Sequence, residues 1–331
     1  MKLLELHILQ SYPVSCLNRD DLNSPKTAMF GGQQRARISS QCYKRAIRML
    51  AKEILPSYFQ GIRTKKELEN LFSSEFTKMG LDPKESKNKA KEIIGNNILG
   101  KDTCVFISPT EISGIAKAFL EGITYDWRLS IDKAADIALF GRMLANAPNA
   151  NIEAASLFAH AISTHKVNNE IDFFSAIDDI SQDQGGAHIG MNEFNSAVYY
   201  RYAGLNLDLL KRNLGNVSKA TLDSIVKAFC EATILAVPHA RETTMNAATL
   251  PGYAKIVCRD KGSPLQVINA FEKGISSKDG YLQPSIEALE SHWSEKSQFF
   301  GINPNLEITI PTKSKSLESV LNEVVEWSNQ L

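Results

Sequence analysis

The stretch from Lys26 to Lys52 carries seven cationic side chains and no acidic one, in a chain whose 37 Lys and Arg balance 37 Asp and Glu. Its cations are Lys26, Arg35, Arg37, Lys44, Arg45, Arg48 and Lys52. Exposed helices normally pair such charges with Glu or Asp one turn away, so a merely solvated face is the less favoured explanation. Without these seven, 30 basic residues remain against 37 acidic ones, so a polyanion would be held in this one place.

Local signals divide this stretch into a turn and a helix. Gly31-Gly32 lets the backbone turn where a side chain would obstruct it. Ser39-Ser40 can cap a helix. Apolar side chains then recur with helical spacing at Tyr43, Ile47, Leu50 and Ile54. We therefore expect a glycine turn followed by a helix with one buried face.

A second face of this helix is cationic. Lys44, Arg48 and Lys52 repeat every four residues, and Gln41 and Arg45 lie beside them. The first turn of a helix also has free N–H groups and the positive end of the helix dipole, which suit a phosphate. The turn, the cap and this face together predict a binding site for a sugar-phosphate backbone.

The overall composition is that of a globular protein. With 331 residues, 43% of them hydrophobic, the chain can bury a substantial core in one large domain or two smaller ones. Its five cysteines are scattered without a CxxC pair, which argues against a disulfide framework and a structural zinc. The N-terminus lacks the apolar core of a signal peptide, and no segment has the roughly twenty apolar residues that span a bilayer. We expect a cytoplasmic protein without membrane contact.

Periodicity elsewhere predicts a chain of mixed α and β structure. Alternation at Leu4, Leu6 and Ile8 predicts a strand with one face on the core, and Ser108-Pro109-Thr110-Glu111 is a helix start. Further strands are expected at 198–203, 253–258 and 306–310, and helices at 216–236, 265–275, 283–297 and after a cap at Ser316. Residues 154–165 fit a helix or a strand by periodicity.

Several motifs resemble one protein family. They are SCLNRDD (Ser15 to Asp21), SPK (Ser24 to Lys26), FGG (Phe30 to Gly32), RARISSQ (Arg35 to Gln41), KRAIR (Lys44 to Arg48), GRM (Gly141 to Met143), AHAISTHKV (Ala159 to Val167), DFFSAIDD (Asp172 to Asp179), AHIG (Ala187 to Gly190), YYRYAGLNL (Tyr199 to Leu207) and DGYLQPSIEA (Asp279 to Ala288). In this order they resemble the CasC family, the repeated backbone subunits (the Cas "seven" group) of the type I-E CRISPR complex Cascade. The likeness covers most of the chain and is weakest between Leu55 and Asp132.

The resemblance implies an α+β fold. An RRM-like (ferredoxin-like) antiparallel sheet would form a palm from residues 1–62 and 148–331, with a helical fingers insertion at 63–147. An extended thumb loop or hairpin would occupy about 168–197 within the palm. On the same basis, residues 154–165 would form a central strand.

The resemblance also implies RNA-binding residues near the N-terminus. Those in its basic loop and along its contacts with the RNA backbone are Arg19, Lys26, Arg37, Ser39, Ser40, Gln41, Lys44, Arg45 and Arg48. Gln33 and Gln34 depart from the family pattern, because a further cation is expected after the FGG motif. Phosphate would therefore be held more weakly at that corner.

A wedge between RNA bases is implied for the thumb. In the family, the thumb of one subunit crosses the RNA bound by the next and displaces a base at regular intervals. Phe173 and Phe174 would be the wedge residues, with Met143 packing on bases nearby, since a stacked base contributes roughly 1–3 kcal/mol. The alternative is that both phenylalanines anchor the thumb to the core. His188 would contact RNA or the adjacent subunit, or be an ordinary surface histidine.

These assignments imply a non-catalytic subunit of a ribonucleoprotein. About six copies would stack head to tail along a guide crRNA and leave its bases free to pair with target DNA. The other partners implied are the large, small, five-prime-capping and crRNA-processing subunits of Cascade. No cofactor or metal is expected, because His160 and His165 are five residues apart and would point to opposite faces of a strand.

Two other functions stay open. Adjacent carboxylates at Asp20 and Asp21, beside the basic loop, could bind a divalent metal and make the chain a ribonuclease that cuts target RNA. The other explanation for these carboxylates is that they fold the loop. The chain could also be a stand-alone binder of single-stranded RNA, with a short, fixed footprint. The polar loop Arg241 to Thr244, between Pro238 and Pro251, has no assigned role.

Overall fold

The computed structural model describes residues 1–95, 104–127, 133–144, 146–176 and 188–330. They form two compact units. The helical unit comprises Met1, Arg48–Leu157 and Leu205–Phe229, and the sheet unit comprises Lys2–Ile47, Phe158–Gly204 and Cys230–Leu331. These units follow other boundaries than the predicted palm and fingers, whose division at 63–147 stays a prediction.

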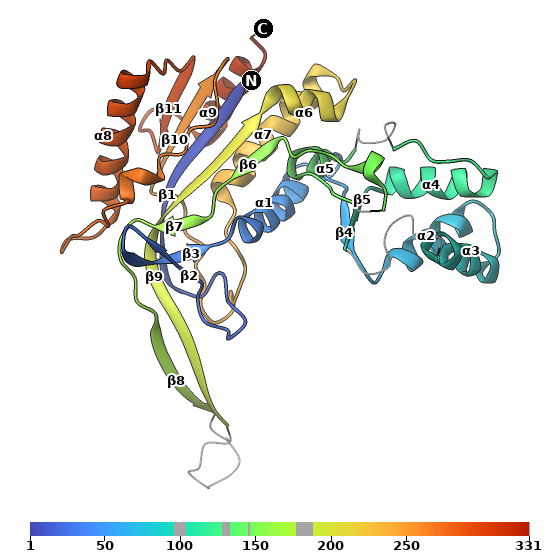
Figure 1. Cartoon of the computed structure of the whole chain (residues 1–331), viewed down its shortest axis with the longest axis horizontal. Coiled ribbons are helices and arrows are strands. Elements are labelled where there is room, and N and C mark those ends of the chain that lie inside the picture. The colour runs from blue at the N-terminus through green and yellow to red at the C-terminus, as the bar shows by residue number, and fades with distance from the viewer. Residues whose placement is uncertain (96–103, 128–132, 145, 177–187, 331) are drawn as a thin grey trace. The chain divides into compact units, whose positions relative to one another are not determined.

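The sheet unit is built on a nine-stranded sheet (Figure 1). Seven strands pair in the order β11-β10-β1-β9-β7-β3-β2, and β6 and β8 also pair with β9. The strands are β1 Leu3–Ser15, β2 Thr27–Phe30, β3 Gln33–Ile38, β6 Ser156–Phe158, β7 Ala161–Ser163, β8 Glu170–Ala176, β9 His188–Asn206, β10 Tyr253–Arg259 and β11 Leu306–Ile310. In chain order, β1, α1 (Ser40–Ile54), β7, β9, α7 (Lys219–Leu235) and β10 follow the β-α-β-β-α-β arrangement of ferredoxin-like folds. The predicted α+β class with a large antiparallel sheet is confirmed.

Strand β1 is buried on both faces from Leu3 to Gln10, whereas its alternating sequence predicts one buried face. The difference arises because β1 lies inside the sheet and its polar side chains have partners there. The Glu5 carboxylate accepts hydrogen bonds from the Arg259 guanidinium, and His7 Nδ1 lies 2.9 Å from the Tyr200 hydroxyl. Burial lowers the pKa of His7 to about 3, so His7 is a neutral core residue.

Two predicted elements differ in the structure. The predicted strand at 154–165 is interrupted, since β6 and β7 have three residues each and are separated by Ala159 and His160. The predicted helix at 265–275 is wrong, because only a 3-10 turn forms there, at Ile268–Phe271. Val267 and Phe271 are buried in the core of the sheet unit, so packing rather than helix propensity decides this segment.

The other predicted helices of the sheet unit are confirmed. Helix α8 spans Leu282–Phe300 and α9 spans Leu317–Ser328. The Ser316 side chain caps α9 by accepting a hydrogen bond from the Ser319 N–H at 3.2 Å. Of the helices that the described residues form, none has the length and hydropathy that crossing a lipid bilayer requires.

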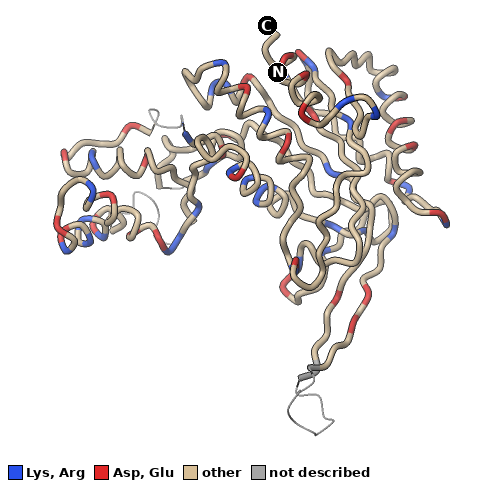
Figure 2. Tube along the Cα trace, turned by 180° about the vertical axis from the view of Figure 1, so that it is seen from behind, with Lys and Arg blue, Asp and Glu red and all other residues tan. Residues whose placement is uncertain are grey.

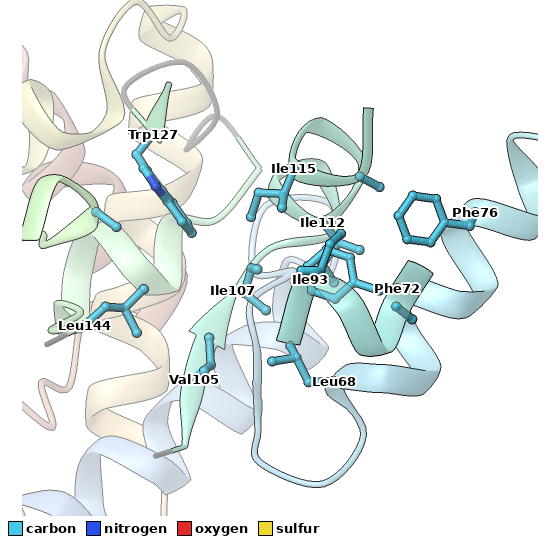
Figure 3. Packing of buried hydrophobic residues seen from close by; sticks show 13 residues of the cluster. Leu68, Phe72, Phe76, Ile93, Val105, Ile107, Ile112, Ile115, Trp127 and Leu144 are labelled. Carbon is cyan, nitrogen blue, oxygen red and sulfur yellow. The ribbon is translucent and has the colours of Figure 1, made fainter. Parts of the chain in front are cut away.

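The helical unit has its own hydrophobic core (Figure 3). Its elements are β4 Ile62–Thr64, α2 Leu68–Lys78, α3 Pro83–Gly95, β5 Val105–Ile107, α4 Pro109–Glu121, α5 Ala135–Phe140, the 3-10 turn Pro148–Ala150 and α6 Leu207–Leu214. Phe72 and Phe76 of α2 pack with Ile93 of α3 and with Ile112 and Ile115 of α4.

The predicted start of α4 is confirmed in detail. Ser108 Oγ accepts a hydrogen bond from the Glu111 N–H at 3.1 Å, and Glu111 Oε2 accepts one from the Ser108 N–H at 2.8 Å. The same carboxylate forms a buried ion pair with Arg142, at 2.7 Å. The Arg142 of the GRM motif is therefore a structural residue that ties the helix start to the segment after α5.

Candidate nucleic-acid interface

The basic loop before β2 is folded around the carboxylate of Asp20. Asp20 Oδ1 accepts hydrogen bonds from the N–H groups of Leu22, at 2.9 Å, and Ser24, at 3.0 Å. Arg19 is exposed, and its Nη1 donates to the Asn23 side chain at 3.3 Å. One oxygen of Asp20 is thus engaged in holding the turn that presents Arg19.

The β2–β3 hairpin turns at the glycine pair. Gly31 and Gly32 have φ values of 57° and 72°, a left-handed conformation that glycine adopts without a Cβ clash. Gly31 also lies against the backbone, because a Cβ there would stand 1.7 Å from the Glu272 carbonyl oxygen. The predicted turn is confirmed, and it fixes where β3 and its arginines lie.

The two arginines of β3 have different environments. Arg35 is fully buried and donates to the carbonyl oxygens of Ser163 (3.0 Å), Phe271 (2.9 Å) and Glu272 (3.2 Å). It therefore holds the sheet unit together and is not available to a phosphate. Arg37 is half-buried, and its guanidinium reaches the Thr27 carbonyl oxygen at 3.2 Å.

Helix α1 begins at the end of β3, with Ser39 as its cap. Ser39 Oγ accepts a hydrogen bond from the Cys42 N–H at 3.3 Å, and the Ser39 N–H donates to Asn18 Oδ1 at 2.8 Å. The Ser40 N–H donates to Nδ1 of His160 at 3.3 Å. Ser39 therefore caps the start of the helix. The N–H of the next residue, Ser40, points towards the junction between β6 and β7.

Several cations of the sheet unit lie near this helix start. Lys44 Nζ lies over the Phe158 ring, 5.5 Å from its centroid, and burial lowers the pKa of Lys44. Arg45 and Gln41 are exposed on the first turns of α1. The Arg37 N–H donates to the Lys26 carbonyl oxygen at 2.8 Å, which places Lys26 beside Arg37. Burial raises the pKa of the Cys42 thiol, and the charges of Arg45 and Lys26 both act against this rise. The structure thus brings together Lys26, Arg37, Lys44 and Arg45, which we call the α1 cation cluster, and the neutral Gln41 is exposed on the first turn of the same helix.

Two predicted site residues belong to the helical unit. Arg48 lies one turn beyond Lys44 on α1, and its guanidinium stands over the Phe106 ring, 5.2 Å from the centroid. Met143 follows the buried Arg142, and its side chain is 83% exposed. An exposed thioether beside a rigid ion pair is suited to contact a partner.

The predicted thumb is a two-stranded hairpin of β8 and β9, of which residues 177–187 lie outside the described residues. Phe173 pairs with Met191 across the hairpin, and Phe174 pairs with Gly190. Successive side chains of a strand point to opposite faces, so Phe173 and Phe174 do not act on the same face. His188 is the first residue of β9.

The two phenylalanines also differ in exposure. Phe173 is 72% exposed, on the face that carries the exposed Ile171 and Met191. Phe174 is 42% exposed and lies across Gly190, where a Cβ would come within 2.3 Å of its ring. Neither ring is anchored in the core, and only Phe173 projects freely.

The paired part of the hairpin, residues 170–176 and 188–194, is acidic. It contains Glu170, Asp172 and Glu193 and no Lys or Arg, and Figure 2 shows red and no blue along these two segments. The sequence signal was present, because residues 168–197 contain six Asp and Glu and no Lys or Arg. A hairpin of this charge does not attract phosphates. The part suited to RNA bases is the apolar group of Ile171, Phe173 and Met191, beside which Glu193 lies opposite Ile171 on the same face.

Sequence reasoning left the loop from Pro238 to Pro251 without a role, and the structure connects it to the hairpin. Arg241 Nη1 donates to Asn192 Oδ1 of β9 at 2.7 Å. Arg241 has a φ of 55°, which is uncommon for a residue with a Cβ and indicates that the fold fixes this position. No periodicity or motif in the sequence predicts this contact.

Comparison with known proteins was made for the whole chain. A model of the CT1975-like protein family of Cas proteins matches residues 4–329. A chain of a solved "CRISPR RNA-guided surveillance complex, pre-nicking" is similar with a TM-score of 0.84 and 26% identity, covering 98% of this chain and 100% of that one. A chain of a second "CRISPR RNA-guided surveillance complex" has a TM-score of 0.65 and 25% identity, with 98% of both chains covered. No match was found among curated proteins.

These matches confirm the resemblance of the sequence to a Cas backbone subunit. The family model spans nearly the whole chain, and the first structure reproduces the fold over its full length. The chain therefore belongs to the Cas family of CT1975-like proteins.

Proposed function

We propose that this protein is a backbone subunit of a CRISPR surveillance complex, of type I-E, that binds the phosphate backbone of a guide crRNA. The observation that carries the proposal is the α1 cation cluster. Lys26, Arg37 and Arg45 come from a loop, a strand and a helix, and no acidic residue lies between Lys26 and Lys52 in the sequence. Such a site recognises the charge and spacing of phosphates, not the bases.

The hairpin supplies the second part of the proposal. In an assembly of about six copies, stacked head to tail, the exposed face of Phe173 would reach the RNA held by the next copy. Its ring would unstack a base, since apolar side chains inserted at base steps do so in other nucleic-acid complexes. The bases between two wedges would stay free to pair with target DNA. The remaining partners would be the large, small, five-prime-capping and crRNA-processing subunits.

A scaffold without catalysis is favoured over the ribonuclease alternative. Asp20 accepts two backbone N–H groups of its own loop, which supports the loop-folding explanation for the Asp20-Asp21 pair. Incubating the assembled complex with complementary RNA and magnesium decides between the two. Regularly spaced cuts that disappear in Asp20→Ala would overturn the scaffold proposal.

The RNA-binding proposal is tested with the double variant Lys44→Gln/Arg45→Gln in the full chain. Each phosphate contact on a single strand contributes about 0.7 to the slope of log affinity against log salt. We expect the slope to fall by that amount per lost contact, and the affinity to fall about tenfold or more, because hydrogen bonds to charged groups contribute roughly 1.5–3 kcal/mol. Fluorescence anisotropy with a single-stranded RNA measures both quantities.

A matched control is Lys261→Gln/Lys278→Gln, which removes the same charge from two exposed positions of the sheet unit. This control should bind RNA as the wild type does. An unchanged affinity in Lys44→Gln/Arg45→Gln would show that the RNA lies elsewhere.

A further inference from the structure

His160 stands where the predicted strand at 154–165 is interrupted. In the register of β3 with β7, Arg37 pairs with Ile162 and Ile38 pairs with Ala161, so His160 comes next to the point where β3 gives way to α1. Irregularities of this kind re-aim a side chain and are frequent beside functional sites. Here the break turns the imidazole of His160 towards the α1 cation cluster.

The contacts of His160 fix which ring nitrogen carries the proton. Nδ1 lies 3.3 Å from the Ser40 backbone nitrogen and 3.5 Å from Arg37 Nη1. A backbone N–H and a guanidinium can only donate, so Nδ1 accepts from both. The neutral imidazole therefore carries its hydrogen on Nε2. The described residues give Nε2 no acceptor, and the side chain is exposed.

The surroundings of His160 keep it neutral and are cationic. Partial desolvation of the exposed ring lowers the pKa of His160, and the charges of Arg37 and Lys26 lower it further. Lys44 lies over the ring of Phe158, two residues before His160. An N–H donor at the edge of such a cluster is suited to an anionic oxygen acceptor.

We propose that His160 is a further RNA-contact residue, whose Nε2–H donates a hydrogen bond to a phosphate oxygen held by Arg37 and Lys26. The inference rests on the proposed RNA-binding function and adds a neutral donor to its cations. A neutral donor contributes affinity but releases no counterion, since only charge neutralisation does so. His160 and Arg37 should therefore leave different signatures in a salt titration.

The test compares His160→Asn with His160→Gln in the full chain, using a single-stranded RNA as the probe. The Asn amide stands near the position of Nδ1 and can still accept from Ser40, whereas the Gln amide reaches the position of Nε2 and can donate to phosphate. We expect His160→Asn to bind about tenfold more weakly at every salt concentration, as for a lost hydrogen bond to a charged group. Its salt slope should equal that of the wild type, and His160→Gln should recover most of the affinity.

Arg37→Gln provides the contrast, because its salt slope should fall by about 0.7. His292→Asn, on α8, is the matched histidine control and should bind as the wild type does. Wild-type affinity in His160→Asn would overturn the inference. A fall of both the affinity and the salt slope in His160→Asn would also overturn it, because His160 would then only orient Arg37. If the wild type itself shows no salt-dependent binding, the proposed function fails instead.

Imidazole ¹⁵N spectra of the wild-type protein give a readout that depends on no variant. In free protein, Nδ1 should be the unprotonated nitrogen. Adding RNA should shift the Nε2–H resonance of His160 while Nδ1 stays unprotonated. An unmoved Nε2–H resonance under conditions where RNA is bound would contradict the contact.

Discussion

The start of α1 and the β8–β9 hairpin differ in nearly every property, although both are proposed to touch RNA. The α1 cation cluster is set into the sheet unit, where Arg37 donates to a backbone carbonyl oxygen and Ser39 caps the helix that carries Lys44 and Arg45. The hairpin extends from the same sheet, and its paired residues 170–176 and 188–194 carry Glu170, Asp172 and Glu193 and no Lys or Arg. In the proposed function, this difference separates two kinds of RNA contact. Charge would hold the phosphates at one place, and apolar side chains would reach the bases at another.

The largest expected effect distinguishes the two arginines of β3, Arg35 and Arg37. Arg35→Gln removes a buried guanidinium that satisfies three carbonyl oxygens. Each buried polar group left unsatisfied costs about 1–3 kcal/mol, so we expect the free energy of unfolding to fall by about 3 kcal/mol or more. Urea unfolding measures this change.

Arg37→Gln is the matched control for that prediction. It should lower the unfolding free energy by only about 1 kcal/mol, because the half-buried Arg37 loses a hydrogen bond to one backbone carbonyl oxygen, that of Thr27, while weakening RNA binding. If Arg35→Gln is as stable as Arg37→Gln, the division of the basic stretch into structural and RNA-binding cations is wrong.

This division also shows what the sequence can and cannot predict. Charge counting identifies the stretch, and glycine and serine preferences place its turn and its cap, because those signals are local. Charge counting cannot separate Arg35 from Arg37, since their roles depend on Ser163, Phe271 and Glu272, which are far away in the chain. For the same reason, alternation alone did not predict that β1 is buried on both faces.

The hairpin differs from the basic stretch, because local sequence rules alone predict several of its properties. Once residues 170–176 are a strand, adjacency alone places Phe173 and Phe174 on opposite faces. The acidic composition of residues 168–197 is likewise visible in the sequence. The bond from Arg241 to Asn192 is not, since it joins two segments of irregular and regular structure 49 residues apart.

The next effect in size separates the two phenylalanines. Phe173→Ala should remove a stacking contact that contributes roughly 1–3 kcal/mol per base, without lowering the stability of the protein. Phe174→Ala should instead loosen the hairpin at Gly190, with a smaller effect on the RNA. A fluorescent adenine analogue in the crRNA of the assembled complex reports the displaced base, because its emission rises when it is unstacked. If only Phe174→Ala lost the signal, the wedge would be Phe174, on the opposite face of the hairpin, and the assignment to Phe173 would be wrong.

A smaller effect is expected where the loop from Pro238 to Pro251 meets the hairpin. Arg241→Ala removes the hydrogen bond to Asn192 but keeps the positive φ. The free energy of local opening of the hairpin around Asn192 should therefore fall by about 1 kcal/mol. Arg241→Gly loses the same bond but adopts this φ without strain, which offsets part of the loss. Amide hydrogen exchange along β8 and β9 compares the two. Equal exchange in both variants and the wild type would show that Arg241 does not support the hairpin.

The smallest effect concerns the charge of the hairpin itself. Glu170 and Asp172 are exposed on the face of β8 opposite to Phe173, from which their charge would weakly repel an RNA strand that crosses the Phe173 face. Exposed charge interactions contribute about 0.2–1 kcal/mol and are screened by salt. Glu170→Gln/Asp172→Asn should therefore tighten RNA binding by the assembled complex slightly at low salt and not at high salt, while Asp279→Asn leaves it unchanged. Weaker assembly of copies in this variant would show that the acidic face meets cations of the neighbouring protein, and the hairpin would then depend on charge as much as the start of α1 does.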